Sequence, residues 1–150
     1  MNNLENYIKY LCDLMKMELV PIEMISAQEM QQISSENTLA CYNRVTNTVF
    51  IEKKNQYEMM DYYLLSHELR HAWQERTNSE YYFGQCIVGM SEHEYNVTNA
   101  ELDANAFACV AIAKRFGIIT KRTYKTDKMA QDKYTKLVKQ LAREYKVKNL

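Results

Sequence analysis

Apolar residues recur at helical spacing near the start of the chain, which predicts an amphipathic helix from about Leu4 to Met17. Pro21 rules out its continuation, because proline lacks the backbone N–H that a helix interior uses. A short strand is expected over about 18–24 and a short helix over 26–33, with Ser26 as its N-cap. The first 33 residues therefore predict helix, strand and helix in that order.

Two segments rich in strand-forming residues follow, over 38–42 and 48–52, and turn residues 43–47 separate them. This arrangement predicts a β-hairpin. Beyond it, apolar residues at helical spacing predict helices over about 59–76 and 99–116. The expected fold class is therefore α+β, mostly helical, with a small antiparallel sheet just before the first of these two helices.

Length and composition predict one compact domain over residues 1–150. The chain has 47% hydrophobic residues, enough for a sizeable core. Its cysteines are scattered without a C-x-x-C pair, which predicts reduced thiols rather than a disulfide framework. The N-terminus lacks the basic and apolar regions of a signal peptide, and no run of 18 apolar residues occurs. We therefore expect a cytoplasmic protein that does not span a membrane.

An H-E-x-x-H motif, formed by His67, Glu68 and His71, lies inside the helix predicted over 59–76. A spacing of four places both imidazoles on one helical face, where they can reach a single Zn²⁺. Glu68 lies beside them and is the candidate general base, since it could accept a proton from water. The alternative is a helix with incidental histidines. Apolar residues on more than one side of the helix favour the metal, because buried imidazoles need partners.

Two histidines leave a catalytic zinc site incomplete, because such sites normally have three protein ligands. Glu101, near the start of the helix predicted over 99–116, is the candidate third ligand. Asn105, one turn later, could accept the outward N–H of a ligating histidine. Thr98 and Glu101 also match a capping box, in which Glu101 would bind its own helix start. Asp103 is the reserve carboxylate and faces away from Glu101.

His93, in a polar and acidic loop, has three alternative roles. It is a solvated side chain, a rival third zinc ligand, or a hydrogen-bond donor to the oxyanion that develops on a substrate carbonyl. Tyr81, Tyr82 and Tyr95 are candidates for the same donor role. Nothing in the sequence selects among these four residues.

The motif H-E-L-R-H at 67–71, followed by E-L-D-A-N-A-F-A at 101–108, resembles the gluzincin-type zinc peptidases of the ImmA/IrrE group. The resemblance covers roughly residues 38–116. It departs from the group pattern at Arg70, where the group usually has Gly, and at 110–113, which lacks the usual ending.

The resemblance implies a minimal zincin fold with His67, His71 and Glu101 as zinc ligands. It also implies that Glu68 is the catalytic base. Some members of the group are associated with phages or mobile elements and act on a repressor. By that analogy the substrate would be a regulatory protein of such an element.

Charge is divided along the chain. Residues 1–117 carry 9 Lys and Arg against 16 Asp and Glu, whereas residues 118–150 carry 10 against 3. The segment from about 129 to 147 is amphipathic, with lysines on one side, which predicts a basic helix that docks on the acidic body. Contact with nucleic acid or another acidic partner is the alternative. Without a stacking platform or a recognition motif, nucleic acid is the less favoured partner.

These features predict a zinc-dependent endopeptidase, a metal-binding hydrolase whose partner is a protein or peptide substrate. The alternative is a zinc-stabilised regulator that binds another protein without cutting it. The predicted hairpin would either hold an extended substrate by main-chain hydrogen bonds or only cover the core.

Overall fold

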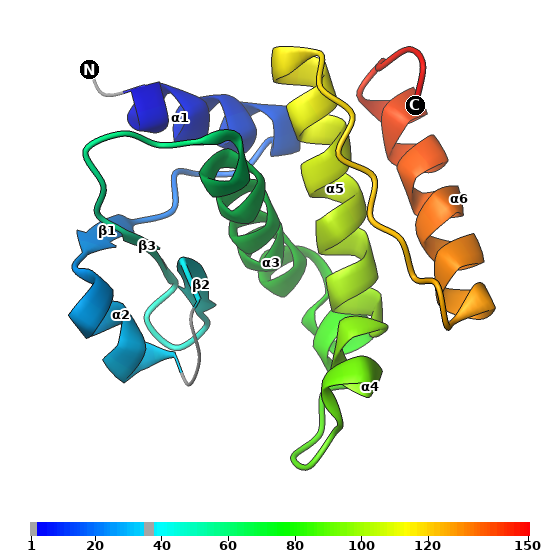
Figure 1. The fold of residues 1–150 in the computed structure, drawn as a ribbon, viewed down its shortest axis with the longest axis horizontal. Helices are drawn as coiled ribbons and strands as arrows, with labels where there is room; N and C mark the ends of the chain where they lie inside the picture. Colours follow the sequence, from blue (N-terminus) through cyan, green and yellow to red (C-terminus); the bar gives the residue numbers. More distant parts are fainter. Residues whose placement is uncertain (1–2, 35–37) are drawn as a thin grey trace. The chain divides into compact units, whose positions relative to one another are not determined.

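The computed structural model describes residues 3–34 and 38–150 and shows a mostly helical α+β chain with a three-stranded sheet, as the sequence predicts (Figure 1). The chain divides into two compact units, Met1–Trp73 and Gln74–Leu150. The elements in chain order are α1 (Asn3–Met15), β1 (Ile22–Ile25), α2 (Ala27–Ile33), β2 (Ala40–Asn43), β3 (Thr48–Glu52), α3 (Met59–Phe83), α4 (Glu92–Asn96), α5 (Asn99–Phe116) and α6 (Lys128–Glu144).

In the first unit, α1 packs through its apolar face against the first half of α3. The Tyr7 hydroxyl lies 2.7 Å from the Ser66 Oγ, and the Tyr7 ring meets the Tyr62 ring edge-on at 5.1 Å between centroids. Helix α2 begins at the predicted cap: the Ser26 hydroxyl accepts from the Glu29 N–H, and the Glu29 carboxylate accepts from the Ser26 N–H. Both predicted N-terminal helices are confirmed.

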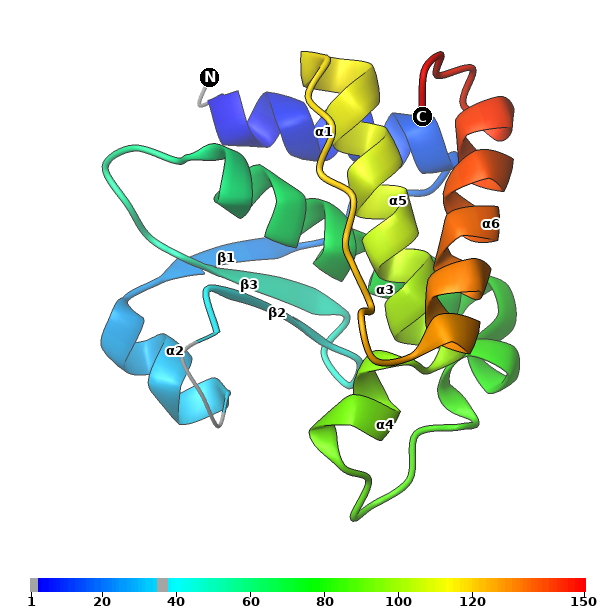
Figure 2. The same cartoon turned by 45° about the vertical axis from the view of Figure 1, so that its right-hand side comes forward.

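The sheet has the strand order β1-β3-β2, with β3 in the middle (Figure 2). Strands β2 and β3 pair antiparallel, from Ala40 with Ile51 to Asn43 with Thr48, so the predicted hairpin is confirmed. The expectation of an antiparallel sheet is wrong for β1, which pairs parallel with β3. Parallel neighbours need a crossover connection. The chain between β1 and β3, which includes α2 and β2, supplies it.

Helix α3 carries the motif and is longer than the sequence predicts. It continues past residue 76 to Phe83, with a non-helical Asn78 (φ −158°, ψ 74°) inside it. Leu65, Leu69 and Ala72 are fully buried. This burial confirms that the helix around the motif belongs to the core.

In the second unit, α6 lies beside α5 (Figure 1). Nearly all of α5 is buried, and Gly117, at φ 70°, ends it in the left-handed conformation that glycine adopts without strain. The buried side chains of α6 are Ala130, Tyr134, Val138, Leu141 and Ala142. The basic C-terminal helix therefore exists and packs within its unit.

Helix α4 lies where the sequence predicts a polar loop, so that expectation is wrong. A capping box explains it, since Ser91 accepts from the Glu94 N–H and the Glu94 carboxylate accepts from the Ser91 N–H. Over residues 3–34 and 38–150, none of the helices has the length and apolar character needed to cross a bilayer.

Candidate metal centre

His67 and His71 point their imidazoles at each other from adjacent turns of α3. Their Nε2 atoms lie 3.0 Å apart, the ring centroids are 4.6 Å apart, and the rings are nearly perpendicular. Both side chains are buried. Two imidazole nitrogens on one tetrahedral Zn²⁺, at bond lengths of about 2.0–2.1 Å, would lie roughly 3.3 Å apart. The pair therefore fits a shared zinc ion if the distance between the two Nε2 atoms increases by a few tenths of an ångström.

Glu68 reaches the edge of the sheet. Its Oε2 accepts a hydrogen bond of 2.8 Å from the Tyr42 N–H in β2. Tyr42 lies opposite Val49, whose N–H donates away from β2, to the Pro21 carbonyl. This pair is therefore one of the non-hydrogen-bonded pairs of the antiparallel ladder, and the Tyr42 N–H points outward. In the sheet that the structure describes, β2 is an edge strand, so Glu68 lies on its outer side.

Cys41, the residue before Tyr42 in β2, is also affected by the charge of the Glu68 carboxylate. Burial raises the pKa of the Cys41 thiol above its ordinary value, and the negative charge of Glu68 raises that pKa further. Cys41 is therefore held as a thiol at neutral pH. An open hollow of about 440 Å³ adjoins the strand, and its lining residues are Ile33, Ser34, Cys41, Tyr42, Asn43 and Arg44.

Arg70 stands where the resembling peptidases usually have glycine, and the structure shows how the helix accommodates it. The side chain is 3% exposed, and its Cζ lies 3.6 Å from the centroid of the Trp73 ring. A guanidinium on an aromatic face keeps its charge while its plane is covered. The departure from glycine therefore leaves α3 intact.

In the second unit, Glu101 lies in the first turn of α5 and is 6% exposed. The Thr98 hydroxyl caps this helix by accepting from the Glu101 N–H at 3.4 Å. The reciprocal bond of a capping box would run from the Thr98 N–H to the Glu101 carboxylate. That N–H instead donates to the Tyr95 carbonyl at 3.1 Å. The cap is present without the box, so the alternative role for the Glu101 carboxylate is wrong.

Asp103, the reserve carboxylate, has a different partner. It is buried and accepts a hydrogen bond of 2.8 Å from the Gln74 Nε2, which also donates to the Ala100 carbonyl at 2.9 Å. The bond ties the start of α5 to the second part of α3. Asp103 therefore has a structural role in its unit.

Asn105 contacts the segment that connects α5 to α6. Its Nδ2 donates to the Tyr124 hydroxyl at 3.2 Å, and its Oδ1 accepts from the Arg122 Nη1 at 3.3 Å. The contact with a ligating histidine stays a prediction. Sequence reasoning did not find Arg122 or Tyr124, since neither belongs to a motif or a periodic segment.

Four influences act on the pKa of Tyr124. Burial raises this pKa above its ordinary value, and the Glu101 charge raises it too, whereas Arg122 and the Asn105 bond lower it. The phenol therefore keeps its proton at neutral pH.

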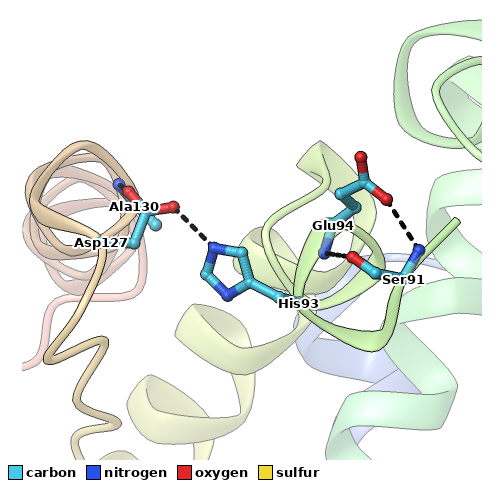
Figure 3. Close-up of polar contacts among 5 residues, drawn as sticks. All are labelled: Ser91, His93, Glu94, Asp127 and Ala130. Carbon is cyan, nitrogen blue, oxygen red and sulfur yellow. Dashed lines mark hydrogen bonds and ion pairs between the residues drawn. The ribbon is translucent and has the colours of Figure 1, made fainter.

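His93 lies on α4 and is a largely exposed side chain. Its Nε2 lies 3.1 Å from the Asp127 Oδ2, and Asp127 also accepts from the Ala130 N–H as the N-cap of α6 (Figure 3). Tyr95, on the same short helix, is 45% exposed. Of the two, His93 joins α4 to the start of α6.

The chemistry of the chain thus centres on a buried imidazole pair, an adjacent glutamate at a sheet edge and a buried glutamate in the first turn of α5. No protein-family model, curated protein or solved structure matches this chain.

Proposed function

We propose that this protein is a zinc-dependent peptidase in which His67, His71 and Glu101 hold the metal and Glu68 is the general base. The observation that carries the proposal is the convergence of two buried imidazole nitrogens, 3.0 Å apart, on the helix that also bears Glu68. Without a metal, this contact is a hydrogen bond only if one ring carries its proton on Nε2 and the other does not. A shared zinc ion would satisfy both nitrogens at once.

The donor set supports zinc. His67, His71 and Glu101 are buried, each offers one ligand atom, and as a group they could hold a metal ion. Two imidazoles and one carboxylate leave the fourth position of a tetrahedral zinc open, as catalytic sites require. When bound, zinc would polarise a substrate carbonyl and make a water molecule more acidic.

Glu68 would move the proton. It would accept a proton from the attacking water and later deliver it to the amine that leaves. The hydrogen bond from the Tyr42 N–H holds one carboxylate oxygen at the edge of β2 and so limits the directions in which the other can point. The metal held by His67 and His71 would then lie beside Glu68 on the same helix.

A peptide is the substrate that this edge favours. An extended chain can add to an edge strand through main-chain hydrogen bonds, which position its carbonyls without demanding a particular sequence. Strand β2 is such an edge, and Glu68 lies on its outer side. The idea that the substrate is a regulatory protein rests on the resemblance of the motif alone.

Metal content tests the ligand set. Purified protein should hold about one Zn²⁺ per chain, and His67→Ala, His71→Ala or Glu101→Ala should each reduce it strongly. His93→Ala is the matched control, because this exposed histidine should not affect the zinc. Circular dichroism would verify that each variant is folded. Full zinc content in the His67→Ala/His71→Ala double variant would refute the site.

The variant Glu68→Gln separates a peptidase from a binding protein. It should retain zinc and melting temperature, while hydrolysis of a randomised peptide library should fall on the order of 10²-fold or more. A zinc-stabilised binding protein would leave the library uncut in both forms. Equal cleavage by parent and variant would remove Glu68 from the mechanism.

A further inference from the structure

The segment 118–127 runs back along α5 before α6 begins (Figures 1 and 2). Two side chains of α6 hold its backbone. The Arg122 N–H donates to the Tyr134 hydroxyl at 2.9 Å, and the Tyr124 N–H donates to the Gln131 Oε1 at 2.8 Å. Ring contact adds to this, since the Tyr124 and Tyr134 centroids lie 5.5 Å apart. The position of residue 124 is therefore determined by α6.

Both held residues direct their side chains to α5. The side chains of residues 122 and 124 both reach the same residue of α5, Asn105. There they meet the two ends of one amide, because Asn105 accepts from Arg122 and donates to Tyr124. Asn105 is buried, and it follows Glu101 by one helical turn on the same face. The cluster therefore lies beside the proposed third ligand.

The Tyr124 hydroxyl is arranged to donate. Its oxygen already accepts from the Asn105 amide, so its own hydrogen is directed elsewhere. Within residues 3–34 and 38–150, this hydrogen has no protein acceptor. The Arg122 guanidinium, 5.7 Å from the centre of the Tyr124 ring, adds a positive charge to the same place. A protonated phenol and a cation together favour an oxygen that is gaining negative charge.

We propose that Tyr124 is a catalytic residue, whose hydroxyl donates a hydrogen bond to the oxyanion that develops on the scissile carbonyl. Asn105 and Arg122 are positioning residues that aim this hydroxyl. The inference rests on the proposed function, because it needs the substrate carbonyl to lie next to Glu101. It assigns the donor role to a residue outside the four candidates that the sequence offered, one of which, His93, is paired with Asp127.

The test compares Tyr124→Phe with the parent, both loaded with zinc. Acetohydroxamate is the probe, because its anionic oxygen would take the place of the oxyanion. Its affinity, measured by calorimetry, should fall on the order of 10-fold in Tyr124→Phe, while zinc content and melting temperature stay unchanged. On a cleaved peptide, kcat should fall on the order of 10²-fold with little change in KM. Tyr57→Phe is the control, since that hydroxyl donates to the Met24 sulfur and should affect neither quantity.

The outcomes separate the two proposals. If the Tyr124→Phe variant binds zinc and has the same acetohydroxamate affinity and kcat as the parent, this inference alone is overturned. A parent protein that binds no zinc would overturn both the proposed function and the role of Tyr124. A melting temperature that falls in step with the affinity would assign Tyr124 a structural role instead.

Discussion

Helix α6 should contribute to the stability of its unit through a small number of buried side chains, and Leu141→Ala tests this directly. Leu141 is 2% exposed on the face of α6 that packs within the unit. Truncation removes buried methyl groups and leaves a cavity, because the surrounding side chains relax only in part. Leu137, one turn earlier on the same helix, is half-buried and provides a matched control with the same change in helix propensity.

The free energy of unfolding that Leu141→Ala should remove is a substantial part of the total stability. Leu→Ala at a fully buried position typically costs about 2–5 kcal/mol, against a total stability of roughly 5–15 kcal/mol for a folded domain. At roughly 2–4 °C per kcal/mol for a chain of this length, a loss of about 3 kcal/mol would lower the melting temperature by about 6–12 °C. Leu137→Ala should lower it by clearly less, because less of that side chain leaves water on folding.

Thermal unfolding followed by circular dichroism at 222 nm would measure both variants. A double variant, Lys136→Gln/Lys139→Gln, changes only exposed lysines of α6 and should melt close to the parent. Equal shifts for Leu141→Ala and Leu137→Ala would refute the packing argument. If Leu141→Ala leaves the melting temperature unchanged while the lysine variant abolishes a salt-sensitive association with nucleic acid, α6 is a binding arm.

Two further predictions use titrating groups. Burial and the charge of Glu68 both raise the pKa of Cys41, so alkylation of Cys41 by iodoacetamide at pH 8 should be slow in the parent and faster in Glu68→Gln. Mass spectrometry of the labelled peptide would measure the rate. An unchanged rate would contradict the position of Glu68. The hydrogen bond from the Ala130 N–H, and then the contact with His93, lower the pKa of Asp127. The contribution of the Asp127 carboxylate to stability is therefore complete above the ordinary pKa of about 3.9, and it is lost as the pH falls through the lowered value. Melting curves from pH 5 to pH 2.5 should therefore show the parent losing stability relative to Asp127→Asn, because asparagine keeps a capping acceptor but cannot ionise. A difference in melting temperature that does not change with pH would argue against the lowered pKa of Asp127.

Several features of the fold follow from local sequence. The helices α1, α2, α5 and α6 are close to their predicted ranges, because each has an apolar face at helical spacing and a recognisable end such as Ser26 or Gly117. The hairpin follows from two strand-forming runs around a turn, in which the Asn43 side chain accepts from the N–H groups of Val45 and Thr46. The meeting of His67 and His71 is equally local, because a spacing of four on one helix sets their separation.

Other features depend on contacts between segments that lie far apart in the chain. No local pattern shows that β1 pairs parallel with β3, that Glu68 binds the Tyr42 N–H, or that Tyr124 lies against Asn105. The physical reason is that backbone hydrogen bonding fixes the spacing inside a helix, whereas the packing of whole surfaces decides which distant groups meet. The sequence by itself determined the two imidazoles and the glutamate beside them. Only the tertiary structure decided which backbone group holds that glutamate and which tyrosine lies near Glu101.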